Sequence, residues 1–236
     1  MSSYSALDSF LAKWHQRWPE WSLVEPFIAV DQRERCVAWF ALLQEFDDIL
    51  AAQGDTTAQD AKLAWWAQEL RSWQGQRSRH PLGRVLDPLR APWMGLADVL
   101  PDLPAARAAL SDPGVARRAL QAYAAAVAAV EAVVFDAPLQ PQAAQAVLVH
   151  TLGQRLLRSG QQAVPASIAG NDAGQVVAAW AQQLLKGWGV RVAGPRPRRV
   201  LALLARLRLQ GLAADKPLTP HQATVLLKAW WAARGR

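Results

Sequence analysis

The sequence has few of the residues that mark several protein classes. Its 236 residues include a single cysteine, Cys36, so no internal disulfide can form. This fits a reducing compartment and excludes a scaffold held together by disulfides. No apolar run approaches the roughly 20 residues that a membrane-spanning helix needs. The first residues also lack the apolar stretch and small-residue cleavage site of a signal peptide. We therefore expect a cytoplasmic protein.

The sequence also lacks the common motifs for metal binding and nucleophilic catalysis. Its four histidines, at positions 15, 80, 150 and 221, are scattered without the spacing of a zinc site. It contains no Gly-rich phosphate loop, no nucleophile elbow and no Cys-x-x-Cys pair. These absences argue against a zinc enzyme, a P-loop nucleotide-binding protein and a nucleophilic hydrolase.

The composition and the spacing of apolar residues predict a helical protein. Hydrophobic residues make up 52% and charged residues 19% of the chain, as in a globular domain. Apolar residues recur every three or four positions, and short Pro, Gly and Asp breaks separate these segments. We predict one all-α domain over residues 1–236, with helix N-caps at Thr57, Asp172 and Thr219. The predicted helices are 5–17, 31–52, 57–74, 104–110, 114–135, 141–158, 173–187, 197–211 and 220–233.

Positive charge is concentrated in the C-terminal part of the chain. Residues 176–236 carry eleven of the 26 Lys and Arg residues but only one of the 19 acidic residues, Asp215. This segment has a formal charge of +10, whereas residues 1–175 have a formal charge of −3, which gives +7 overall. Such an excess favours contact with phosphate groups on a lipid surface, a diphosphate or a nucleic acid.

The helix predicted at 197–211 combines this charge with an apolar face. Its apolar residues share one arc and its arginines flank that arc: Val200, Leu203, Leu204 and Leu207, with Arg199, Arg206 and Arg208. A basic amphipathic helix can bind anionic lipid. We therefore expect the basic C-terminal helices either to meet the inner membrane surface or to be bundle helices whose arginines face water. The segment has no DNA-reading motif, which argues against a nucleic-acid partner.

Carboxylates cluster on the helix predicted at 31–52. Glu45, Asp47 and Asp48 lie within one turn of each other. A hard cation such as Mg²⁺ needs carboxylate oxygens that converge, and residues three apart on a helix share a face. Glu45 and Asp48 meet this condition, whereas Asp47 points about 100° away from Asp48. The cluster indicates either a Mg²⁺ site or a solvated helix end.

Two stretches of sequence resemble a known family. Residues 38–51, AWFALLQEFDDILA, resemble the first aspartate-rich helix of the squalene/phytoene synthase family. Residues 62–82, which contain KLAWWAQEL and His-Pro-Leu, are similar to the family's next helix at the same distance downstream. Weaker similarity continues through Tyr123 to residues 152–165. The resemblance covers about residues 25–165.

The resemblance implies a helical bundle of the isoprenoid synthase type, in which two aspartate-rich helices hold Mg²⁺ against the diphosphates of two prenyl substrates. It implies that Glu45, Asp47 and Asp48 would hold the metal and that Tyr123 is a catalytic candidate. Four arginines would bind diphosphate: Arg33, Arg35, Arg155 and Arg158. Four apolar side chains would line the prenyl cavity: Phe40, Leu43, Trp65 and Trp66.

The sequence departs from the family pattern at both metal motifs. The closing aspartate of the first motif is Ala51, and its arginine is Gln44. Residues 150–160 stand where the second aspartate-rich run belongs, yet no Asp or Glu occurs between Asp136 and Asp172. A cation held between two helices needs ligands from both. Without that metal ion, the departing diphosphate loses several kcal/mol of charge stabilisation.

We therefore predict a degenerate member of this family that is non-catalytic or weakly active and needs no cofactor. It would hold an isoprenoid or lipid ligand or serve a protein partner of unknown identity, in the cytoplasm or at the inner membrane surface. The alternative is a head-to-head prenyltransferase that uses Mg²⁺ and acts on prenyl diphosphates. A third alternative, a nucleic-acid binder that uses residues 176–236, would show binding that weakens steeply with salt.

Overall fold

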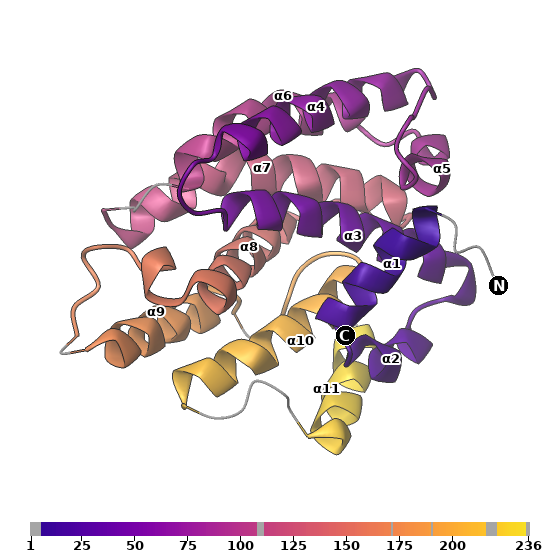
Figure 1. Cartoon of the computed structure of the whole chain (residues 1–236). Helices are drawn as coiled ribbons and strands as arrows, with labels where there is room; N and C mark the ends of the chain where they lie inside the picture. Colours follow the sequence, from indigo (N-terminus) through magenta and orange to yellow (C-terminus); the bar gives the residue numbers. More distant parts are fainter. Residues whose placement is uncertain (1–5, 108–110, 171, 190, 216–220, 235–236) are drawn as a thin grey trace.

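The computed structural model describes residues 6–107, 111–170, 172–189, 191–215 and 221–234. These residues form eleven α-helices and five short 3-10 helices, and no strand occurs among them. The all-α prediction is therefore confirmed (Figure 1). No helix in the described ranges combines the length and the hydropathy needed to cross a bilayer.

The helices follow one another along the chain with short connections. The α-helices are α1 (Ala6–Arg17), α2 (Trp21–Val24), α3 (Arg33–Leu50), α4 (Thr57–Gln74), α5 (Gly83–Leu86), α6 (Trp93–Val99), α7 (Pro113–Val134), α8 (Ala143–Ser159), α9 (Ala173–Gly187), α10 (Arg196–Ala213) and α11 (Gln222–Arg234). The 3-10 helices are η1 (Glu25–Phe27), η2 (Val30–Gln32), η3 (Asp87–Leu89), η4 (Leu100–Arg107) and η5 (Gly160–Ala163).

Eight of the nine predicted helices are confirmed to within a few residues, and the helix predicted at 104–110 is wrong. Residues 100–107 form the 3-10 helix η4 with Pro104 inside it, and residues 108–110 lie outside the described residues. Proline removes a backbone donor and clashes with the preceding turn, so a regular α-helix does not form there. The short helices α2, α5 and α6 were not predicted, because each is too brief for a repeating apolar pattern.

Two of the predicted caps can be checked, and one of them is wrong. Asp172 caps α9, because its Oδ1 accepts a hydrogen bond from the backbone N–H of Gln175 at 2.9 Å. At α4 the capping oxygen belongs to Asp55, which accepts from the N–H of Thr57 at 2.9 Å, and Thr57 itself is the first helical residue. The predicted cap at Thr219 lies outside the described residues.

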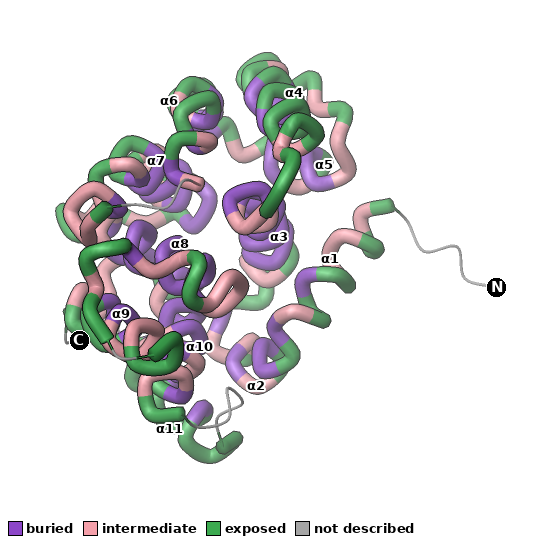
Figure 2. The backbone as a smooth tube through the Cα atoms, turned by 60° about the vertical axis from the view of Figure 1, so that its left-hand side comes forward, coloured by how far each residue is buried: buried purple, intermediate pink, exposed green. Residues whose placement is uncertain are grey.

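Helix α3 lies at the centre of the molecule, with α4 above it, α8 on one side and α1 on the other (Figure 2). Most of its residues are buried, so α3 is covered on nearly all sides. Tryptophans fill much of the space around it. Seven tryptophans of the chain are at most 1% exposed: Trp14, Trp21, Trp39, Trp66, Trp73, Trp93 and, on α9, Trp180.

Helix α10 is a central bundle helix. Its apolar arc faces the core, with Val200, Leu204 and Leu207 buried, and it packs against α8, α9 and α11. Gly153 of α8 lets the two helices approach closely, because a Cβ at this position would lie 2.8 Å from Leu209 Cδ1. The arginines predicted at the flanks of the arc, Arg199, Arg206 and Arg208, are half-buried. Arg198, which the prediction did not name, is 1% exposed and paired with Glu131.

Candidate functional site

The acidic cluster lies near the C-terminal end of α3, where α1, α4 and α8 meet that helix. Glu45 is only 4% exposed, and Asp47 and Asp48 are partly buried. The interpretation of this cluster as a solvated helix end is therefore wrong for Glu45. A carboxylate in such a place is stable as an anion only if cations or donors satisfy it.

Two lysines from neighbouring helices neutralise Glu45. Lys13 Nζ of α1 donates to Glu45 Oε1 at 2.9 Å, and Lys62 Nζ of α4 donates to Oε2. Burial opposes ionisation of this carboxyl, but the hydrogen bonds from Lys62 and Lys13 outweigh it and lower the pKa of Glu45. The hydrogen bond that Lys13 donates to Glu45 also raises the pKa of Lys13. Glu45 therefore joins α1 and α4 to α3 as an ionised group.

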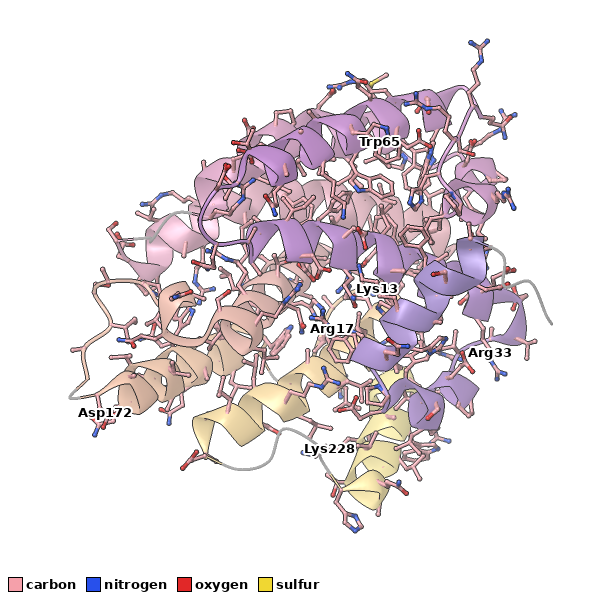
Figure 3. All side chains as sticks on the ribbon, viewed as in Figure 1. Lys13, Arg17, Arg33, Trp65, Asp172 and Lys228 are labelled. Atoms are coloured by element: carbon pink, nitrogen blue, oxygen red, sulfur yellow. The ribbon has the colours of Figure 1, made fainter. Side chains whose placement is uncertain are left out.

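Asp48 is paired across the bundle with an arginine from the opposite helix. Arg158 NH1 of α8 donates to Asp48 Oδ1. Lys13 Nζ lies 3.6 Å from Asp48 Oδ2, and Arg17 NH2 lies 3.9 Å from Oδ1. Lys13 thus contacts both Glu45 and Asp48, which confirms that these two carboxylates share a face. Figure 3 shows Lys13 and Arg17 on α1, where this helix crosses α3.

Asp47 differs from its two neighbours because its carboxylate makes no hydrogen bond or ion pair within the described part of the chain. It faces a cavity of about 20 Å³ between α1, α3, α8 and α10. Burial raises the pKa of Asp47 to about 7, with a contribution from the charge of Asp48 and against the opposing charge of Arg158. This carboxyl therefore titrates near neutral pH.

Other polar atoms around this cavity are buried without a partner in the described residues. They are Gln44 Oε1, His150 Nδ1 and Gln154 Nε2. Burial lowers the pKa of His150 well below its usual range, so the imidazole is neutral. A cavity of this size accommodates about one water molecule, which could bridge such atoms. It is far too small for a prenyl chain, since ligand pockets usually exceed about 300 Å³.

The two arginines predicted at the start of α3 do not join this site. Arg33 Nε donates to the carbonyl oxygen of Ile28 at 3.2 Å, and Arg35 NH2 lies 3.6 Å from Asp31 Oδ2. Both bind near the N-terminal end of the helix. Twelve residues separate Arg35 from Asp47, which corresponds to about 18 Å along a helix.

The other predicted polar residues are divided between the site and the core. Arg158 reaches the acidic cluster, whereas Arg155 is buried and donates to the carbonyl oxygen of Arg107 at 3.3 Å. Burial lowers the pKa of Arg155. Tyr123 is 3% exposed and packs against Phe46 with ring centroids 6.3 Å apart. Burial, with the nearby charge of Asp47, raises the pKa of Tyr123 well above its usual range, so its hydroxyl stays protonated.

The four residues predicted to line a prenyl cavity fall into two pairs. Phe40 and Leu43 line the small cavity beside Asp47. Trp65 and Trp66 lie on α4, where both rings pack against His80. Trp65 is 37% exposed and lies at the top of the molecule in Figure 3.

Residues 62–82, the second stretch with the resemblance, form most of α4 and the turn that follows it. Glu69 is fully buried and accepts hydrogen bonds from Trp73 Nε1 at 2.9 Å and from the backbone N–H groups of Arg79 and His80 at 2.6 and 2.8 Å. The rings of His80 and Trp66 pack in a tilted arrangement, with centroids 4.5 Å apart. In this chain the tryptophan pair, the glutamate and the histidine therefore have a shared structural role.

Sequence reasoning missed Lys13, Arg17 and Lys62. A signal was available, because every buried carboxylate needs a cationic or hydrogen-bonding partner. Lys13 and Arg17 are also four residues apart and so share one face of α1. What the sequence could not give was which of the many basic residues would reach α3.

The three carboxylates do not form a fitting set of ligands for Mg²⁺. Oxygens of Glu45 and Asp48 already accept from ammonium and guanidinium groups, so a metal would have to displace these cations. Helix α8 brings Arg158 to the position where a second acidic wall would be needed. Within the described residues, no group of three or more His, Cys, Asp and Glu side chains is arranged to hold a metal ion.

Comparison with known proteins identifies no relative. No protein-family model matches the chain, and no curated protein or solved structure matches it either.

Proposed function

We propose that the chain is a non-catalytic protein of the squalene/phytoene synthase type that holds an isoprenoid or lipid ligand. The similarity of residues 38–51 and 62–82 supports the family assignment. The packing of α3 against α8 also supports it, because the resemblance implies that these two helices stand where the metal-binding helices of that family would lie. In this proposal the bundle is of the isoprenoid synthase type, and the protein acts in the cytoplasm or at the inner membrane surface.

The pairing of Asp48 with Arg158 carries this proposal. In a head-to-head synthase, metal ions between two acidic helices neutralise a departing diphosphate. Here an arginine from the opposite helix neutralises the carboxylate directly, and Lys13 and Lys62 do the same for Glu45. Losing charge stabilisation of several kcal/mol corresponds to orders of magnitude in rate, at about 1.4 kcal/mol per tenfold.

The small cavity beside Asp47 gives further support. A carbocation reaction needs a dry apolar chamber around the prenyl chains, and the space here is about 20 Å³. Large side chains occupy this part of the bundle, among them Trp14, Trp18 and Phe40. Binding of a lipid or isoprenoid therefore has to use another surface of the molecule.

Release of diphosphate from farnesyl diphosphate tests the proposal. The full-length protein is incubated with the substrate, with Mg²⁺ or with EDTA, and the released diphosphate is measured. We expect the same low rate in both conditions. Release that requires Mg²⁺ and is abolished by Asp48→Asn would overturn the proposal and favour a Mg²⁺-dependent prenyltransferase.

A further inference from the structure

A groove of about 730 Å³ lies between α10, α11 and the segment that precedes α10. It is remote from the acidic cluster in sequence, because the residues that line it come only from positions 140–142 and 191–232. Its volume lies within the range of pockets that bind small organic ligands. The groove therefore has room for a lipid-sized molecule.

The walls of the groove carry positive charge and no negative charge. Arg191, Arg206 and Lys228 line it, together with Arg199, and no Asp or Glu is among the lining residues. Arg191 and Lys228 are exposed and make no side-chain hydrogen bond or ion pair within the described ranges. Figure 3 shows Lys228 on α11, near the lower edge of the molecule. Cations grouped without counter-charges favour an anionic ligand.

Arg199 helps to build the groove. Its Nε donates to the carbonyl oxygen of Ala232 at 2.8 Å, its NH2 to that of Ala233 at 3.2 Å, and its NH1 to that of Gly194 at 2.8 Å. These bonds hold the C-terminal end of α11 against the start of α10. Arg206 is likewise attached to the structure, because its NH1 donates to the carbonyl oxygen of Gly189 at 3.1 Å.

Apolar side chains line the groove beside the cations. Leu203, Leu207 and Trp231 contribute to its surface. Trp231 is 64% exposed, an unusual position for so large an apolar group. Apolar surface next to clustered cations matches a ligand that has an anionic head and a hydrocarbon tail.

We propose that this groove binds one molecule of an anionic amphiphile with a phosphate head group. Arg191, Arg206 and Lys228 hold the head group, and the tail lies along Leu203, Leu207 and Trp231. The inference rests on the proposed function, for which it supplies the ligand class and the site. A single molecule fits better than a bilayer, because cations and apolar residues line one concave space rather than a protruding face. Binding of single-stranded nucleic acid relies on basic and aromatic side chains, so the two leucines of the groove favour a hydrocarbon tail instead.

Isothermal titration calorimetry with decyl phosphate tests the inference on the full chain. Decyl phosphate is titrated below its critical micelle concentration, and inorganic phosphate and decanol are titrated separately. We expect one binding site for decyl phosphate, with an affinity at least about tenfold higher than that of either part alone.

Three variants locate the site. The double variant Arg191→Gln/Lys228→Gln should weaken decyl phosphate binding by about tenfold or more, because it removes two cations without breaking an internal bond. Trp231→Ala should weaken decyl phosphate binding but leave the binding of inorganic phosphate unchanged. The matched control is Arg77→Gln/Arg84→Gln, which removes two exposed cations near α5 and should have no effect. Circular dichroism and thermal unfolding establish that each variant is folded.

Several results would overturn the inference. These are equal weakening by the control variant, inorganic phosphate that binds as tightly as decyl phosphate, and no binding at all. Binding to phosphatidylglycerol vesicles or to duplex DNA without binding of monomeric decyl phosphate would overturn it as well. Each outcome is independent of the diphosphate-release assay, which reports on α3 and α8. The groove and the non-catalytic assignment can therefore fail separately.

Discussion

Replacing Asp47 with asparagine should change the pH dependence of stability in a defined direction. Burial raises the pKa of Asp47 from 3.8 to about 7 in the folded chain. Between these pH values the folded state binds more protons than the unfolded state. The contribution of Asp47 to the free energy of unfolding therefore falls as the pH rises from about 4 to about 7, and it is constant above that.

The size of this effect follows from the same two values. At about 1.4 kcal/mol for each pKa unit, the full effect is at most about 4 kcal/mol. Asp47 is only partly buried, so solvent screening reduces this ceiling, and we expect about 1–2 kcal/mol. Asp47→Asn should be about as stable as the wild type at pH 4 and more stable by that amount at pH 8.

Urea unfolding of both proteins across this pH range measures the difference. Asp55→Asn is a control for which the change of stability with pH should have the opposite sign. Hydrogen bonds from Thr57 lower the pKa of Asp55, so the wild type has a stabilising contribution above the ordinary pKa that the variant lacks. A stability difference for Asp47→Asn that does not vary with pH, or a loss of stability at pH 8, would refute the reasoning.

Three further predictions concern ion pairs and hydrogen bonds that hold the helices together. Glu69→Gln should lower the free energy of unfolding in urea by about 2–4 kcal/mol, because it leaves buried donors poorly paired; a loss below about 0.5 kcal/mol would contradict this. Arg198→Met should cost about 3–5 kcal/mol by leaving the buried Glu131 without its cationic partner, while the hydrogen bond from Trp39 Nε1 at 2.9 Å remains. Adding Glu131→Gln, which removes the charge and keeps an acceptor for Trp39, should recover part of that loss; no recovery would count against the buried ion pair. A double-mutant cycle of Asp48→Asn and Arg158→Gln should give a coupling of about 1 kcal/mol that declines with salt, and zero coupling at low salt would exclude the pair.

Helix positions could be predicted from the sequence because they depend on local spacing. The apolar period predicted α3, α4 and α7 to within a few residues, and the Asp172 cap was recognisable from Asp172 and the glutamine three residues later. The predictions that failed did so for local reasons. Pro104 prevents a regular α-helix at residues 104–107, which form part of η4, and α6 is too short to show an apolar period.

The acidic cluster itself was predictable, but its partners were not. Glu45 and Asp48 share a face because they are three residues apart. Their cations come from far along the chain: Lys13 is 32 residues from Glu45, and Arg158 is 110 residues from Asp48. Only the packing of α1 and α8 against α3 selects these residues from the 26 Lys and Arg residues of the chain.

The burial of Arg198 could not be predicted for the same reason, because its partner is distant in sequence. The amphipathic pattern placed Arg199, Arg206 and Arg208 at the edge of an apolar arc, where water is the usual neighbour, and gave no position to Arg198. The structure instead brings Glu131 of α7 to Arg198, and both side chains are 1% exposed. A buried ion pair of this kind depends on two helices that are distant in sequence, so no periodicity within α10 could indicate it.

In our account, the carboxylates of Glu45 and Asp48 are occupied by ion pairs and do not bind a metal. Titration of Mg²⁺ and inorganic diphosphate into the full chain is the direct test of this statement. Isothermal titration calorimetry is carried out on the wild type and on Asp48→Asn. We predict the same Mg²⁺-dependent heat for both proteins, because the carboxylate of Asp48 is already paired with Arg158. Saturable binding of Mg²⁺ and diphosphate together that disappears in Asp48→Asn would contradict the account.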